Sequence, residues 1–122
     1  MRSLVLVAHG SRREASNQEV RHVAEQLQAR AMDVFDRVTA AYLELAGPTI
    51  PEAIENCIRA GADEVVVIPY FLAAGRHMSD DIPAIIEAAR EAHPDVSIRV
   101  TPYVGAAPGV VDLLLDLARA TD

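Results

Sequence analysis

Residues 4–14 read LVLVAHGSRRE, and this stretch decides the fold class. The apolar run Leu4–Ala8 has no polar interruption and stops at His9 and Gly10. A second run of the same kind, EVVVIP, occupies Glu64–Pro69. Strands buried on both faces have this continuous apolar pattern, and they occur in parallel sheets covered by helices. The stretch therefore predicts a parallel sheet of the α/β class.

Strand-like runs alternate with helical segments along the rest of the chain. In the helical segments, apolar residues recur at i, i+3, i+4 and i+7. The predicted strands are Ser3–Ala8, Arg37–Glu44, Glu64–Pro69 and Val96–Thr101, and the predicted helices are Ser16–Ala31, Ile50–Ala60, Ile82–Ala92 and Pro108–Ala120. The order βαβαβαβα is that of a small doubly wound domain with four parallel strands, here one domain over residues 1–122.

Capping signals support the helix boundaries. Ser16 with Glu19, and Thr49 with Glu52, have the spacing of capping boxes at helix starts. Gly61 follows the second predicted helix, where a left-handed residue commonly ends a helix.

Composition limits the possible partners. The formal net charge of −7 argues against nucleic acid and anionic membranes. The only cysteine is Cys57, which is expected to be a buried apolar residue, and no apolar stretch is long enough to span a bilayer. We therefore expect a cytoplasmic protein. The two edge strands of a four-stranded sheet have unpaired backbone groups that must be covered. We therefore also expect a homodimer.

Candidate site residues follow the predicted strands. Ligands of open α/β sheets bind outside the carboxyl ends of the strands. His9 follows the first strand, Glu44 ends the second, and His77 lies in the loop after the third. Imidazole and carboxylate groups can hold a divalent metal such as Fe, Co, Ni or Zn, or act as bases near neutral pH. His22 and His93 fall within or at the end of helices, where a solvated face and a helix terminus explain them.

Other α/β classes lack their required residues. Histidine phosphatases have an arginine before the histidine, whereas Ala8 precedes His9. The acidic pair of a receiver domain, a GxGxxG after the first strand and a GxSxG around Ser11 are all missing.

Four segments carry a family resemblance: HGSR at 9–12, AYLE at 41–44, VIPYFLAAGRH at 67–77 and DIP at 81–83. On these motifs the sequence resembles the CbiX/SirB family of class II chelatases, in its short single-domain form. The resemblance implies a flavodoxin-like chelatase half-domain. It also implies insertion of a divalent metal into sirohydrochlorin, a tetrapyrrole with many carboxylates, in sirohaem or cobalamin biosynthesis.

By this resemblance His9 and His77 would be the catalytic, metal-binding histidines, and Glu44 the acidic residue between them. The substrate-binding residues would be Gly10, Ser11, Arg12, Phe71, Leu72 and Arg76. The metal is a substrate, Co²⁺ or Fe²⁺ with Ni²⁺ as a further candidate, and no organic cofactor is expected. Short relatives are expected to pair as homodimers. A non-enzymatic carrier of metal or tetrapyrrole is the alternative, because the same histidines would serve it.

Overall fold

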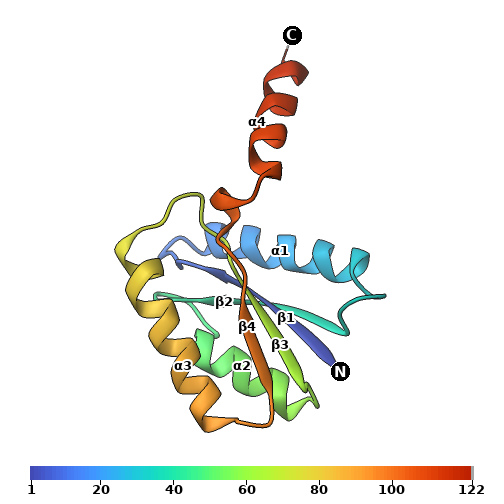
Figure 1. Ribbon diagram of the computed structural model, residues 1–122. Coiled ribbons are helices and arrows are strands. Elements are labelled where there is room, and N and C mark those ends of the chain that lie inside the picture. The colour runs from blue at the N-terminus through green and yellow to red at the C-terminus, as the bar shows by residue number, and fades with distance from the viewer. Residues whose placement is uncertain (122) are drawn as a thin grey trace.

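A computed structural model describes residues 1–121, apart from the side chains of His77 and Met78. It contains one parallel sheet with the strand order β2–β1–β3–β4, and helices alternate with the strands (Figure 1). The strands are β1 (Arg2–Ala8), β2 (Arg37–Tyr42), β3 (Glu64–Pro69) and β4 (Ser97–Val100). The α-helices are α1 (Glu14–Arg30), α2 (Ile50–Arg59), α3 (Ile82–Ala92) and α4 (Gly109–Ala120); the short helices are η1 (His77–Asp81) and η2 (Val104–Ala106). The predicted doubly wound α/β fold is confirmed.

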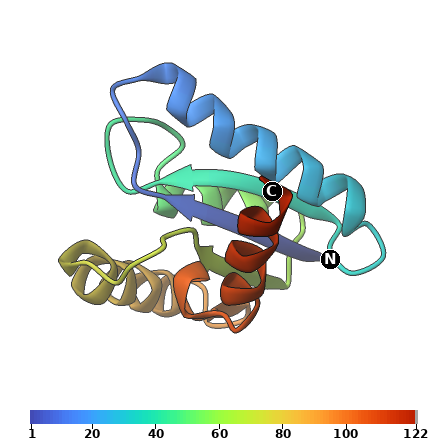
Figure 2. The ribbon, with the colours of Figure 1, turned by 90° about the horizontal axis from the view of Figure 1, so that it is seen from above.

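Helices cover both faces of the sheet, which explains the uninterrupted apolar strands. Figure 2 shows α1 and α3 on opposite sides of the sheet, and the shared core cluster of α2 and α3 places α2 on the same face as α3. Val5 and Val7 of β1 pack in the core beneath α2 and α3, whereas Leu6 packs in the core beneath α1. Because successive side chains of a strand point to opposite faces, β1 needs apolar residues at every position.

Two of the predicted helix signals are present. Thr49 forms the capping box at the start of α2: its Oγ1 accepts from the Glu52 backbone N–H at 3.3 Å, and the Thr49 N–H donates to Glu52 Oε1 at 3.0 Å. Gly61 follows α2 with φ +107°, the left-handed conformation expected there.

The predicted start of the first helix at Ser16 is wrong. Helix α1 begins earlier, at Glu14, so Ser16 lies inside its first turn. The turn before the helix is closed by other groups: Ser11 Oγ accepts from the Arg13 N–H at 3.0 Å, and Asn17 Oδ1 accepts from the Ser11 N–H at 3.0 Å. These hydrogen bonds pair the backbone N–H groups of Ser11 and Arg13 without the Ser16 hydroxyl.

At the amino edge of the sheet, Glu64 of β3 binds an arginine from each neighbouring strand. Its Oε2 accepts from Arg2 Nε at 2.7 Å, and its Oε1 accepts from Arg99 Nη2 at 2.6 Å. The hydrogen bonds from Arg2 and then Arg99 lower the pKa of the Glu64 carboxyl below its ordinary value. One carboxylate thus joins β1, β3 and β4.

Cys57 is fully buried on α2, and burial raises the pKa of its thiol because it disfavours the thiolate. We expect the native protein at pH 8 to react with a thiol-specific disulfide reagent at least roughly 100-fold more slowly than the unfolded chain, because reaction requires local opening. Following the released chromophore with and without denaturant checks this, and an equal rate in both conditions would contradict the buried position.

No helix among residues 1–121 is long and apolar enough to cross a membrane.

Candidate active site

The strand order reverses between β1 and β3. Because β1 pairs with β2 on one side and with β3 on the other, the connections that leave β1 and β3 run toward opposite sides of the sheet. Ligands of open α/β sheets bind in the crevice outside the carboxyl ends at such a reversal. His9 follows β1 there, and the loop 70–76 follows β3. The Tyr70 N–H donates to the Val7 carbonyl at 2.7 Å and ties the two strand ends together.

A histidine–carboxylate pair stands at this edge. His9 Nε2 lies 3.7 Å from Glu44 Oε1, and each side chain is 48% exposed. Although β2 ends at Tyr42 rather than at the predicted Glu44, the pairing continues through backbone bonds from Leu43 N–H to the Ala8 carbonyl at 3.0 Å and from Glu44 N–H to the His9 carbonyl at 3.1 Å. The strand ends therefore hold the two side chains next to each other and open to solvent.

Gly10 permits the close approach of these two strand ends. Its φ is +96°, and a Cβ added there would lie 1.8 Å from the backbone oxygen of Glu44. Only glycine fits such a position without displacing the neighbouring chain. The close contact with the Glu44 backbone therefore requires glycine at position 10. The same contact sets the distance between Glu44 and His9.

The turn after Gly10 is held by a buried amide. Asn17, 2% exposed, accepts from the Ser11 N–H at 3.0 Å and donates from Nδ2 to the Ser11 carbonyl at 2.8 Å. The backbone N–H of Ser11 is therefore used within the protein. Hydrogen bonds from Arg21 and then Asn17 lower the pKa of Glu14, so the first turn of α1 already carries a carboxylate.

Asn17→Ala should destabilise the protein by about 1–3 kcal/mol, because the Ser11 N–H and carbonyl lose their side-chain partner in a part-buried position. The turn beside His9 should also loosen, which lowers the rate of any reaction at this edge. Denaturant unfolding measures the first effect. The matched control is Gln18→Ala, at an exposed position one residue along α1. Equal unfolding midpoints for the two variants would contradict the role of Asn17.

The loop after β3 is fixed by the loop after β4. Gly105 donates from its N–H to the Phe71 carbonyl at 2.9 Å, and a Cβ on Gly105 would lie 1.8 Å from the Leu72 oxygen. Phe71 is partly buried and packs against the core under α2 and α3, whereas Leu72 is 78% exposed. Together with Tyr70 and Val104 they line a cavity of about 220 Å³. The sequence left open whether one of these apolar residues packs in the core, and in the structure Phe71 does so.

A second cavity, of about 300 Å³, adjoins Glu44. Its lining residues are Leu43, Glu44, Asp81, Ala84 and Ile85. Asp81, the last residue of η1, was not among the predicted site residues. The signal for it was present in the DIP motif at 81–83, whose aspartate shares the lining of this cavity with Glu44.

His77 begins η1, so its backbone is helical rather than the predicted loop. Its side chain lies outside the described part of the structure. Arg12 and Arg76 are exposed near the same edge of the sheet. Among the side chains that are described, no three His, Cys, Asp or Glu groups gather closely enough to hold a metal ion.

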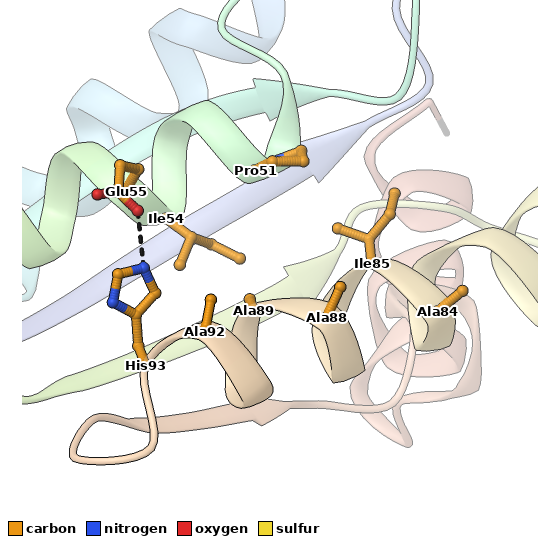
Figure 3. A pocket seen from close by; sticks show the side chains of 9 residues that line it. All are labelled: Pro51, Ile54, Glu55, Ala84, Ile85, Ala88, Ala89, Ala92 and His93. Atoms are coloured by element: carbon orange, nitrogen blue, oxygen red, sulfur yellow. Dashed lines mark hydrogen bonds and ion pairs between the residues drawn. The ribbon is translucent and has the colours of Figure 1, made fainter.

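The other histidines lie on helices, as expected. His22 is exposed on α1, with Nδ1 4.0 Å from Glu25 Oε2. His93 follows α3, and its Nε2 lies 2.7 Å from Glu55 Oε2 of α2 (Figure 3). This pair closes one end of an apolar groove of about 420 Å³ between α2 and α3, where four of the nine lining residues are alanines. This side-chain hydrogen bond between His93 and α2 explains His93 without a role at the sheet edge.

The fold and site define a class: a doubly wound α/β protein with a histidine–carboxylate pair at the reversal of strand order. The model of the CbiX family matches residues 3–121. The chain therefore belongs to the CbiX family, which confirms the resemblance found in its motifs.

Curated relatives agree with this assignment. The chain is 46% identical over 86 residues to the sirohydrochlorin cobaltochelatase of Methanococcus maripaludis, covering 70% of this chain and 58% of that protein. It is 31% identical over 142 residues to the sirohydrochlorin cobaltochelatase of Methanocaldococcus jannaschii, covering 97% of this chain and 98% of that protein.

Among solved structures, the chain is similar to the sirohydrochlorin chelatase SirB from Bacillus subtilis subspecies spizizenii in complex with cobalt, with a TM-score of 0.83 and 28% identity. The match covers 98% of this chain and 50% of the SirB chain. This chain thus spans about half of SirB and 58% of the Methanococcus maripaludis protein.

Proposed function

We propose that this chain is a chelatase that inserts Co²⁺ or Fe²⁺ into sirohydrochlorin, with the metal as a substrate. The observation that carries the proposal is the pairing of His9 with Glu44, at 3.7 Å, where the strand order reverses. Membership of the CbiX family supports the same activity.

Metal insertion replaces two pyrrolic N–H protons of the macrocycle with one M²⁺, so two protons must leave. A neutral imidazole can ligate a borderline divalent ion or accept a proton. An open site with few protein ligands suits delivery of an ion, because a closed tetrahedral cage would retain it. His9 and Glu44, each about half exposed, provide such an open pair.

We assign His77 as the second metal-binding histidine, because η1 begins at this residue and ends at Asp81 beside the Glu44 cavity. Glu44 either ligates the ion or orients His9, with which it is already in contact. Asp81 adds a second carboxylate to the same cavity.

Substrate carboxylates would bind the exposed guanidinium groups of Arg12 and Arg76, which offset the net charge of −7 locally. The Ser11 hydroxyl can donate a further bond. Leu72, because it is exposed, supplies the apolar wall for the ring, and Phe71 supports that wall from the core.

In this proposal residues 1–122 act as one chelatase domain, two copies pair as a homodimer, and the protein works in the cytoplasm. A single buried cysteine fits a reducing compartment.

The experiment mixes the purified protein with sirohydrochlorin and Co²⁺ or Fe²⁺ and follows the absorbance change against a sample without protein. The expected result is repeated turnover, with many equivalents of metal inserted per protein. Stoichiometric binding without acceleration would reject the chelatase and identify a carrier of metal or tetrapyrrole. Rates with each ion compare the two metals.

A further inference from the structure

Leu45 combines two unfavourable features in the loop that follows β2. Its φ is +65°, and among residues 1–121 it is the one non-glycine residue with a left-handed backbone. It is also a large apolar residue that is 55% exposed. A left-handed backbone crowds the Cβ of leucine, and exposure leaves its apolar surface in water. Glycine or asparagine at this position would avoid both costs. Strain of this kind often occurs where a side chain serves a ligand.

The backbone on both sides of Leu45 is held by contacts. The preceding residue, Glu44, donates its N–H to the His9 carbonyl at 3.1 Å, and its carbonyl lies where Gly10 leaves no room for a Cβ. The following residue, Ala46, packs against the core beneath α1. The loop cannot turn Leu45 inward without breaking these contacts. The exposed position of the leucine is therefore set by the fold, next to the residue that pairs with His9.

A second exposed leucine follows the strand on the other side of β1. Leu72, 78% exposed, comes after β3 as Leu45 comes after β2, and β1 with His9 lies between these two strands. Neighbouring strands are about 4.8 Å apart, so the ends of β2 and β3 are about 10 Å apart. The loop of Leu72 is also held in place, because the Gly105 N–H donates to the Phe71 carbonyl at 2.9 Å. One imidazole thus has an exposed leucine on each side.

A ligand that suits this edge is flat, apolar on its faces and anionic at its rim. A planar ring laid across the ends of three strands can contact both leucines and present its centre to His9. The exposed guanidinium groups of Arg12 and Arg76 lie near the same edge and suit carboxylates at the rim of the ring. A tetrapyrrole with many carboxylates has this form.

We propose that Leu45 is a substrate-contact residue, which packs on the tetrapyrrole ring on the β2 side of His9, opposite Leu72. The inference rests on the proposed function, because the tetrapyrrole is the substrate named there. A hydrocarbon side chain neither ligates a metal nor accepts a proton. Its contact with the ring is therefore equal in the ground state and the transition state, and its loss should raise KM for the tetrapyrrole without lowering kcat.

The experiment compares Leu45→Gly with the unchanged protein, because glycine removes the side chain and accepts the left-handed backbone. We expect KM for sirohydrochlorin to rise about 10-fold, the effect of losing part of a buried leucine contact. Both kcat and KM for the metal should stay within about two-fold. The melting temperature should change by less than about 3 °C, because relief of strain offsets the greater freedom of glycine in the unfolded chain.

Two control variants separate the ring contact from a general effect of substitution. Leu45→Met keeps an apolar side chain of similar volume at the same position, and KM should stay within about two-fold of the original value. Met32→Ala removes a 73% exposed apolar side chain from the loop that precedes β2, at the opposite edge of the sheet. It should leave KM for sirohydrochlorin unchanged.

The dissociation constant for sirohydrochlorin without metal, from an absorbance titration, separates this inference from the proposed function. If the unchanged protein binds sirohydrochlorin without turnover, and Leu45→Gly binds it about 10-fold more weakly, the chelatase is overturned and the role of Leu45 stands. If the unchanged protein turns over and Leu45→Gly keeps its KM, the role of Leu45 is overturned and the chelatase stands.

Two further results would also overturn the role of Leu45. A lower melting temperature and a lower kcat in Leu45→Gly, with KM unchanged, would make the leucine a structural residue. A changed molar mass in light scattering, with KM unchanged, would make it a contact with another protein molecule.

Discussion

A His9→Ala variant should insert Co²⁺ or Fe²⁺ into sirohydrochlorin at least about 100-fold more slowly than the unchanged protein, the usual loss when a positioned acid–base group is removed. The imidazole lies 3.7 Å from Glu44 and is 48% exposed. In the proposed function its removal takes away a metal ligand and proton acceptor, and it takes little from the core. Steady-state absorbance measurements give the rate. The substitution should change the free energy of unfolding, measured by thermal unfolding, by no more than about 0.5 kcal/mol.

The matched control is His22→Ala, which removes an exposed imidazole from α1 on the same chain. We expect it to retain full turnover. If His9→Ala kept more than half of the activity with both substrates saturating, the site would have to be moved away from the end of β1. The same measurement on His77→Ala tests whether the second histidine acts with the first.

Gly10→Ala should lower the free energy of unfolding by roughly 3 kcal/mol, the sum of left-handed backbone strain and overpacking. The φ of +96° is unfavourable for alanine, and the added Cβ would meet the Glu44 backbone oxygen at 1.8 Å. For a domain of this size the melting temperature should fall by roughly 10 °C. Because relief of the contact moves Glu44 away from His9, turnover should fall as well.

Gly75→Ala is the control for this substitution, since a Cβ there meets no atom within 4 Å. It lies in the loop after β3, near the same sheet edge, and should leave the melting temperature almost unchanged. Similar melting temperatures for Gly10→Ala and the unchanged protein would show that the β1 and β2 ends separate freely, and that Gly10 does not set the site geometry.

The sequence predicted the fold well because the sheet is buried on both faces. The continuous apolar runs of β1 and β3 leave few alternatives, and β3 and α3 have the predicted bounds Glu64–Pro69 and Ile82–Ala92. The convergence of His9 and Glu44 also followed from topology, since parallel strands end at a common edge.

Local turns and long-range contacts were harder to predict. Ser16 and Asn17 both have polar side chains suited to a helix start, and only the folded turn shows that Asn17 binds the Ser11 backbone. Phe71 and Leu72 differ in burial, and their backbone is in close contact with Gly105, over thirty residues away. No local pattern records that contact. The leucines of α4 likewise predicted a helix but not its projection from the sheet.

The carboxylate of Glu64, shared by Arg2 and Arg99, makes the fold sensitive to acid at its amino edge. Its pKa is lower in the folded protein than in the unfolded chain, so the stabilisation is complete above the ordinary carboxyl range and declines as the pH falls through the lowered value. Once protonated, it leaves two guanidinium groups with no counter-charge between them. In strong acid the repulsion falls on Arg2 of β1 and Arg99 of β4, and the sheet would begin to open at the end opposite His9 and Glu44.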